Sequence, residues 1–165
     1  MGSGKSVIGR NLSKAISYNF HDLDNFITTK EGLTINEIFE QKKEIYFRKI
    51  EREYLKELIN KDEEKVISLG GGTPCYDNNM EIILNTVDSD SIYIHRSISF
   101  LVDRLYNKIY SRPLIAHLKS KEELKEFISK HLFERNQYYL RSKKILKTDN
   151  SELDQVIHEL MDVLG

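Results

Sequence analysis

The first residues of the chain carry the end of a pattern that binds phosphate. Met1 is followed by Gly2-Ser3-Gly4-Lys5-Ser6, which ends like G-x-x-x-x-G-K-[ST], where backbone amides and a lysine hold phosphates and a hydroxyl holds a metal ion. The first glycine of that pattern, and the apolar strand that feeds it, would both precede Met1. An N-myristoylation signal, a Gly/Ser tract left by cloning and a flexible terminus explain the same residues. These residues suggest a phosphate site and leave the alternatives open.

Two aspartates that come next suit another part of phosphoryl transfer. Asp22 and Asp24 stand two apart at the end of a segment expected to be extended, so both side chains should share one face. One carboxylate would support a magnesium ion through water, and the other would accept the proton of an alcohol that receives the phosphoryl group. Capping of a turn or a helix is the alternative use of one of them.

A triple glycine at 70–72 follows an apolar segment at 65–69. Glycine permits positive φ and lets a ligand come within hydrogen-bonding distance of the backbone. A tight turn needs one glycine or two, so three in a row favour a binding surface over a plain connection.

The elements expected around these residues alternate between helix and strand. Apolar residues at helical spacing from Val7 to Ile16 predict a helix directly after the phosphate pattern, where its N-terminal amides would hold an anion. The alternation predicts a parallel sheet covered on both faces, whose ligands bind beyond the carboxyl ends of the strands. Further helices are expected at 34–60, with a candidate break near Lys43, and at 78–86, 98–108, 121–139 and 152–164, and strands at 20–23, 65–69, 91–95 and 144–147.

Composition limits the class of protein. The chain has 165 residues, enough for one domain, and its 25 Lys and Arg against 26 Asp and Glu give a net charge of −1. This near-neutral balance argues against a general nucleic-acid binder. No apolar run approaches the roughly 20 residues of a membrane span or the about 7 to 15 at the centre of a signal peptide. The single cysteine, Cys75, excludes an internal disulfide and favours a reducing, cytoplasmic location.

The motifs occur together in an order that resembles the shikimate kinase family of P-loop kinases, over nearly the whole chain. Many unrelated nucleotide-binding proteins share a phosphate loop, whereas Asp-x-Asp, Phe-Arg-x-x-Glu, the triple glycine and Arg-Pro-Leu together are far more specific. The matching segments are Gly2 to Ser6, Asp22 to Asp24, Ile35 to Glu40, Phe47 to Glu51, Gly70 to Gly72, Arg112 to Leu114, and Glu134-Arg135 with Tyr139.

The resemblance implies the three-layer α/β fold of the P-loop kinases, with a parallel sheet of strand order 2-3-1-4-5 between helices on both faces. The first, central strand is missing from the chain as given, and we expect the true start to lie upstream of Met1. Residues 1–165 would form a single domain, with a lid segment at about 109–120 that closes over the nucleotide.

The activity implied by the resemblance is transfer of the γ-phosphoryl group of ATP to the 3-hydroxyl of shikimate. The products would be shikimate 3-phosphate and ADP, in chorismate and aromatic amino-acid biosynthesis. We expect a monomer that uses one Mg²⁺ ion with ATP and has no membrane or nucleic-acid partner. Two rivals remain, a kinase of another small hydroxylated substrate such as gluconate and a nucleotide-binding homologue without catalysis.

On the nucleotide side, the resemblance assigns roles to residues near both ends of the expected site. Lys5 would bridge the β- and γ-phosphates, Ser6 would ligate magnesium, and Asp22 would support the ion through water. Arg112 matches the lid arginine that stabilises the charge of the transferring group, and Arg104 resembles one that stacks on adenine. The implied ATP-binding set is Gly2, Ser3, Gly4, Lys5, Ser6, Val7, Arg104 and Arg112.

On the acid side, Arg48 and Arg135 match the arginines that bind the carboxylate of shikimate bidentately. Glu51 lies three residues after Arg48, where it would fix the guanidinium. Asp24 would bind the hydroxyls and accept the proton, which makes it catalytic together with Lys5 and Arg112. The backbone of the triple glycine, Gly70, Gly71 and Gly72, would contact the substrate, and Phe39 and Phe47 would form an apolar wall or belong to the core.

Arginine is scarce in this chain, since the 25 basic residues divide into 17 Lys and 8 Arg. Four of the eight fall at motif positions, and we expect the other four, Arg10, Arg52, Arg96 and Arg141, on the surface. One departure from the family's pattern is Gln137, because a proline usually stands two residues after the arginine matched by Arg135.

Overall fold

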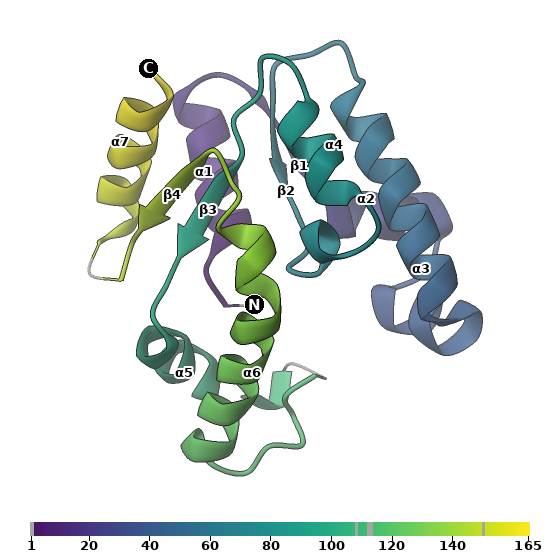
Figure 1. Ribbon diagram of the computed structural model, residues 1–165, viewed down its shortest axis with the longest axis vertical. Coiled ribbons are helices and arrows are strands. Elements are labelled where there is room, and N and C mark those ends of the chain that lie inside the picture. The colour runs from purple at the N-terminus through teal and green to yellow at the C-terminus, as the bar shows by residue number, and fades with distance from the viewer. Residues whose placement is uncertain (1, 108, 112–113, 150) are drawn as a thin grey trace.

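The computed structural model describes residues 2–107, 109–111, 114–149 and 151–165. None of the helices in these ranges has the length and apolarity that crossing a membrane requires. Helices separate the successive strands along the chain, as expected, although two helices stand between the first two strands (Figure 1). The elements are α1 Lys5–Ala15, β1 Asn19–Asp22, α2 Leu23–Glu31, α3 Ile35–Ile59, β2 Lys65–Ser68, a 3₁₀ turn Thr73–Cys75, α4 Asn79–Asn85, β3 Ile92–His95, α5 Ile98–Tyr106, a 3₁₀ turn Ile109–Ser111, α6 Lys121–Tyr139, β4 Lys144–Lys147 and α7 Leu153–Leu164.

The strands form two parallel pairs. β1 pairs with β2, with Asn19 opposite Lys65, and β3 pairs with β4, with Ile92 opposite Lys144. These are the pairs 2-3 and 4-5 of the predicted order, so the strand arrangement is confirmed for the strands that the chain contains.

One helical layer joins the two strand pairs. Apolar residues of α1 and α7 pack in one cluster with Val66 of β2, Ile92 and Ile94 of β3, and Leu146 of β4. Both pairs therefore lie under the same helices, and their carboxyl ends face one edge of the molecule, where Figure 1 places the start of α1.

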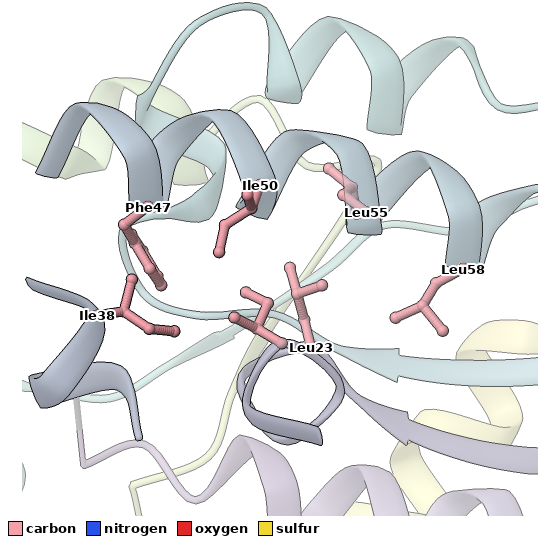
Figure 2. Packing of buried hydrophobic residues seen from close by; sticks show 7 residues of the cluster. Leu23, Ile38, Phe47, Ile50, Leu55 and Leu58 are labelled. Carbon is pink, nitrogen blue, oxygen red and sulfur yellow. The ribbon is translucent and has the colours of Figure 1, made fainter. Parts of the chain in front are cut away.

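The opposite face of the first pair is covered by α2 and α3. Figure 2 shows their contact, in which Leu23 of α2 faces a row along α3. Leu23 and Leu58 are fully buried, and the row consists of Ile38, Phe47, Ile50, Leu55 and Leu58. This packing fixes the position of every functional side chain on α2 and α3.

The helix α3 begins with a capping box and bends where the sequence suggested a break. The Oγ1 of Thr34 accepts a hydrogen bond from the backbone amide of Glu37, whose side chain accepts from the Thr34 amide. Lys43 has φ 69° and ψ 169°, outside helical geometry. The residues after this bend, from Glu44 onward, carry the Phe-Arg-x-x-Glu motif toward the triple glycine.

The helix α2 was not predicted. Asp22 and Asp24 were expected on one extended segment, but β1 ends at Asp22 and α2 begins at Leu23. The segment is short and its apolar spacing is weak, so the strand-to-helix change left little periodicity to read.

Candidate active site

The phosphate loop is held against α5. Gly4 has φ 90°, and a side chain added there would meet the guanidinium nitrogens of Arg104 at 3.4 Å. Gly2 has φ 79° and lies against the side chain of Leu105. Two glycines are therefore required by backbone geometry, and α1 starts directly after them with amides available for an anion.

Lys5 and Ser6 meet the ends of β1 and β2. The Oγ of Ser6 donates a hydrogen bond of 2.6 Å to Oδ2 of Asp22, and the Nζ of Lys5 lies 3.4 Å from both Ser6 Oγ and Ser68 Oγ. Ser68 was missed in the sequence analysis. The signal for it is a polar residue that follows the apolar pair Val66-Ile67 at the end of the strand, two positions before the triple glycine at 70–72.

Asp22 and Asp24 lie close together, but not for the reason first given. Asp22 is the N-cap of α2, and its Oδ1 accepts hydrogen bonds from the amides of Asp24 at 3.1 Å and Asn25 at 3.4 Å. The cap interpretation is therefore correct for Asp22, which also contacts Ser6 through its other oxygen. One carboxylate thus serves both helix and loop.

Asp24 lies in the first turn of α2 beside the triple glycine. A side chain at Gly70 would come within 3.0 Å of the Oδ1 of Asp24. Burial raises the pKa of Asp24, the charges of Lys5 and Arg48 act in the opposite direction, and the charge of Asp22 adds to the rise. Asp24 is therefore a carboxyl with raised basicity next to two cations, which suits a proton acceptor.

Arg48 is held on three sides. Its Nη1 donates to Oε2 of Glu51 at 2.8 Å, and its Nε and Nη2 both lie 3.2 Å from Oε1 of Glu44. The ring of Tyr76 stacks on the guanidinium at 3.6 Å. Burial alone would lower the pKa of Arg48, but the hydrogen bond and charge of Glu51 raise it above its ordinary value. The surface-pair interpretation of Arg48 and Glu51 is wrong, because Glu51 is only 1% exposed.

Arg48 also touches the triple glycine. A side chain at Gly72 would come within 3.0 Å of the Nη1 of Arg48. An open cleft of about 680 Å³ borders Arg48 and Tyr76 on the outer side of α3, and its lining includes neither Asp24 nor the phosphate loop. Glu44 takes the Nε and Nη2 edge here, so a carboxylate ligand that binds this edge has to displace Glu44.

Arg135 and Tyr139 approach the same glycines from α6. The hydroxyl of Tyr139 donates a hydrogen bond to the carbonyl of Gly71. Burial raises the pKa of Tyr139 to about 12, and Arg135 opposes this rise. Burial also raises the pKa of the Cys75 thiol, against the charges of Arg135 and Arg48. Arg48 and Arg135 therefore act on one small region around Cys75, as two arginines sharing one anion would.

The structure thus brings Asp24, Arg48 and Arg135 around the triple glycine, and it brings the predicted metal ligands Ser6 and Asp22 into contact with each other. Val7, called ATP-binding, is 52% exposed on α1. Arg112 lies outside the described residues. Phe47 belongs to the core at 4% exposure, and Phe39 packs on it with ring centroids 4.6 Å apart.

The expectation that Arg96 lies on the surface is wrong. Arg96 follows β3 directly and is 6% exposed, with its guanidinium over the ring of Phe100 at 4.2 Å. Its Nε and Nη1 are buried without a hydrogen-bond partner within the described part of the chain. Burial lowers the pKa of Arg96, neighbouring Arg104 lowers it further, and Asp149 opposes both. A count of residue types had no means of finding this burial.

Ser6 and Asp22 fit a metal ion bound mainly through a nucleotide. Among the described residues, no group of three or more His, Cys, Asp or Glu side chains is arranged to hold a metal by itself. A hydroxyl and a carboxylate 2.6 Å apart offer the oxygen ligands that Mg²⁺ prefers, and such ions usually take their remaining ligands from phosphates and water.

Comparison with known proteins points to one family. The family model described as shikimate kinase matches residues 1–165. A shikimate kinase of Flavobacterium johnsoniae is 46% identical over 165 residues, which is 100% of this chain and 95% of that protein.

Solved structures agree with this match. A shikimate kinase of Bacteroides thetaiotaomicron superposes with a TM-score of 0.91 at 30% identity, covering 99% of this chain and 93% of that one. A shikimate kinase of Acinetobacter baumannii in complex with shikimate gives 0.85 at 25% identity, covering 99% and 88%. A gluconokinase of Sinorhizobium meliloti gives only 0.56 at 17% identity, covering 99% and 86%, so that likeness is one of fold alone.

Proposed function

The chain belongs to the shikimate kinase family, and from this premise we propose how its residues divide the reaction. The enzyme transfers the γ-phosphoryl group of ATP to the 3-hydroxyl of shikimate, a step of aromatic amino-acid biosynthesis. The proposal rests on one observation above all: Asp24 and Arg48, from different helices, border the triple glycine, since a side chain at Gly70 would come within 3.0 Å of Asp24 Oδ1 and one at Gly72 within 3.0 Å of Arg48 Nη1.

Arg48 and Arg135 bind the carboxylate of shikimate in this proposal. Arg48 presents a fork whose inner nitrogen is fixed by the buried Glu51, while its outer edge is held by the half-exposed Glu44. Exchange of Glu44, of which only Oε1 contacts Nε and Nη2, for the substrate carboxylate replaces a single-oxygen contact by a bidentate ion pair. Arg135 supplies the second cation from α6, and the backbone of Gly70, Gly71 and Gly72 closes the floor.

Asp24 accepts the proton of the attacking hydroxyl. Its raised pKa makes it a better base than an ordinary aspartate, while the charge of the neighbouring Lys5 favours its ionised form. The proton passes from the 3-hydroxyl oxygen to the Asp24 carboxylate as that oxygen bonds to the γ-phosphorus and the bond to the β-phosphate oxygen breaks.

The nucleotide side holds and neutralises the phosphates. Lys5 lies between Ser6 and Ser68, from where its ammonium reaches the β- and γ-phosphates, and the amides of Gly2, Ser3, Gly4, Ser6 and Val7 surround them. The family uses ATP with a divalent metal, and we propose Mg²⁺ held by Ser6, supported by Asp22. When bound, the ion neutralises charge on the β- and γ-oxygens. Arg104 supports the loop, and Arg112 belongs to a lid at about 109–120 that closes over the phosphates.

A coupled assay of ADP release tests this function. We expect turnover with shikimate and Mg-ATP and none above background with gluconate or nucleoside monophosphates. Asp24→Asn serves as the control for contaminating kinases, because it removes the proposed base and should keep the fold. Tight ATP binding without turnover of shikimate would favour a nucleotide-binding homologue without catalysis. Turnover of gluconate would favour a kinase of another small hydroxylated substrate.

We further propose that the enzyme acts as a cytoplasmic monomer with residues 1–165 as one domain. All proposed site residues come from a single chain, and the half-buried Cys75 has no disulfide partner, since it is the only cysteine. Light scattering coupled to size-exclusion chromatography should give the mass of one chain, 19.4 kDa, and a dimer mass would contradict the proposal.

A further inference from the structure

The 3₁₀ turn after the triple glycine carries a fully buried threonine. Thr73 is 0% exposed, and its Oγ1 donates a hydrogen bond of 2.6 Å to Oε1 of Glu51. The other oxygen of Glu51, Oε2, accepts the 2.8 Å bond from Nη1 of Arg48. One oxygen of Glu51 thus accepts from Arg48 and the other from Thr73. The role of Thr73 in this pair of contacts is not part of the function proposed above.

Thr73 is itself rigidly held. Its amide donates to the carbonyl of Gly70 at 3.1 Å, and its carbonyl accepts from the Nδ2 of Asn79 at 2.9 Å. Asn79 is also fully buried and begins α4. The hydroxyl of Thr73 is therefore a fixed point to which the carboxylate of Glu51 is tied.

We propose that Thr73 is a positioning residue that sets the affinity for shikimate by orienting Glu51 and, through it, Arg48. This inference rests on the proposed role of Arg48 in binding the substrate carboxylate. The residue needs no contact with the substrate, because its single hydroxyl proton is used on Glu51.

The physical reason is that Glu51 is an ionised group out of reach of water. At 1% exposure, an oxygen of Glu51 that loses its donor regains none from solvent. Without the Thr73 hydroxyl, the carboxylate turns to share both oxygens with Arg48, its only other partner among the described residues. This rotation of the carboxylate shifts the guanidinium of Arg48 out of the plane in which its Nε and Nη2 edge binds a ligand. Bidentate binding tolerates little misalignment, so the affinity for shikimate falls.

The competing explanation is that Thr73 orients the proposed base Asp24. The Oγ1 of Thr73 and the Oδ1 of Asp24 both lie 3.0 Å from the space where Gly70 would carry a side chain. A threonine that acted on the base would change kcat. A threonine that acts through Glu51 and Arg48 changes the KM for shikimate and leaves kcat at saturation within a few-fold.

The experiment is a graded series at this position, with kcat and both KM values measured in the coupled assay. Thr73→Ser keeps the hydroxyl, Thr73→Cys exchanges it for a weak S–H donor, and Thr73→Val removes it at similar volume. We expect the shikimate KM of the serine variant to stay within about twofold of the wild-type value. The KM of the valine variant should rise about 10- to 100-fold, the range that the cost of an unsatisfied buried acceptor implies, and that of the cysteine variant should lie between. The KM for ATP should not change.

Matched controls keep the series interpretable. Thr86→Val removes a hydroxyl that bonds only to the carbonyl of Ile82 within α4, and should leave all kinetic constants unchanged. Circular dichroism and melting curves report whether each variant folds, and if the valine variant does not, the comparison of serine with cysteine carries the test.

Two results overturn the inference. A fall in kcat at unchanged shikimate KM assigns Thr73 to Asp24, and an unchanged KM in the folded cysteine and valine variants assigns it no functional role. Arg48→Lys separates these from failure of the underlying assignment: if this variant leaves the shikimate KM unchanged, the proposed role of Arg48 is wrong. If it raises the KM while the Thr73 series does not, only the inference about Thr73 is wrong.

Discussion

The two halves of the site differ in how they hold their main cations. On the acid side, Arg48 is paired with Glu44 and the buried Glu51 and stacked on Tyr76, while Arg135 forms no salt bridge within the described residues. On the nucleotide side, the cations Lys5, Arg96 and Arg104 form no salt bridge within the described part of the chain. The hydrogen-bond partners of Lys5 among the described residues are hydroxyls alone, and Arg96 has two buried nitrogens without an acceptor there.

This difference matches the two ligands. A small acid with one charge offers little binding energy, so its arginine must be fixed in advance by the protein's own carboxylates. A nucleoside triphosphate brings several negative charges, and cations without carboxylate partners attract it without an internal competitor. Arg48 is therefore fixed in advance for the weakly charged ligand, whereas Lys5 and Arg104 have no salt bridge among the described residues before the strongly charged ligand binds.

The largest effect is expected where the halves meet, at Asp24. Asp24→Asn should lower kcat by about 10²- to 10⁴-fold, the usual contribution of a positioned base, while circular dichroism stays unchanged. Because burial raises the pKa of Asp24, the folded state holds that proton more tightly than the unfolded state does. Stability therefore falls as pH rises from the ordinary aspartate pKa to the raised one, and the asparagine variant should melt at a higher temperature at neutral pH.

The same shift predicts the acid limb of the wild-type rate. The kcat/KM for shikimate should decline with falling pH at a higher pH than an ordinary aspartate would give, since the base is lost on protonation. Retained activity in the asparagine variant would contradict both expectations.

Arg48→Lys is the next largest change and breaks the acid side alone. A lysine cannot hold Glu51 and bind a carboxylate bidentately, so the shikimate KM should rise about 10- to 100-fold, the worth of one to two charged hydrogen bonds. The ATP KM should stay within twofold. Equal changes in both KM values would mean that the halves are not independent.

Arg104→Gln tests the nucleotide side with a smaller effect. The guanidinium of Arg104 lies against Gly4 of the phosphate loop, and its loss should raise the ATP KM by about 2- to 30-fold, whether it stacks on adenine or supports the loop. Calorimetry with ADP and with adenosine separates these, because only stacking weakens both. An unchanged ATP KM would remove Arg104 from the site.

The smallest effect is expected in stability at Arg96. Arg96→Met removes a buried charge with two unpartnered nitrogens, so the nucleotide-free protein should melt a few degrees higher, at roughly 2–4 °C for each kcal/mol in a chain of this size. Arg141→Met is the matched control, since Arg141 makes an exposed pair with Glu81 and should change the melting temperature little. A lower melting temperature would show that packing of the guanidinium on Phe100 outweighs its burial cost.

Much of the fold was readable because its elements are periodic. The helix 121–139 and the strand 144–147 were predicted with their observed bounds, and the break at Lys43 was placed correctly. The helix α2 was missed because Asp22 both ends a strand and caps a helix, and a nine-residue amphipathic stretch starting there has little room to show a period.

The site was readable only as far as motifs reach. Arg48, Glu51 and Asp24 belong to recognisable patterns, whereas Thr73 and Ser68 act through contacts between segments far apart in sequence. Arg96 is buried with its guanidinium on the ring of Phe100, and neither its residue type nor its motif context indicated this burial. Tertiary contact, not residue type, makes these residues important.

The helix α6 has a mechanical consequence of its own. It runs from its Ser120 cap, next to the lid segment, to Tyr139, whose hydroxyl holds the carbonyl of Gly71. Nineteen residues make a rod of about 28 Å, and Figure 1 shows it as one straight span. Because α6 is held at its Tyr139 end, a displacement of its Ser120 end would rotate the helix as one body and tilt Arg135 relative to the glycines. The proposed closure over the nucleotide and the proposed binding of the acid would thereby be coupled through a single stiff helix.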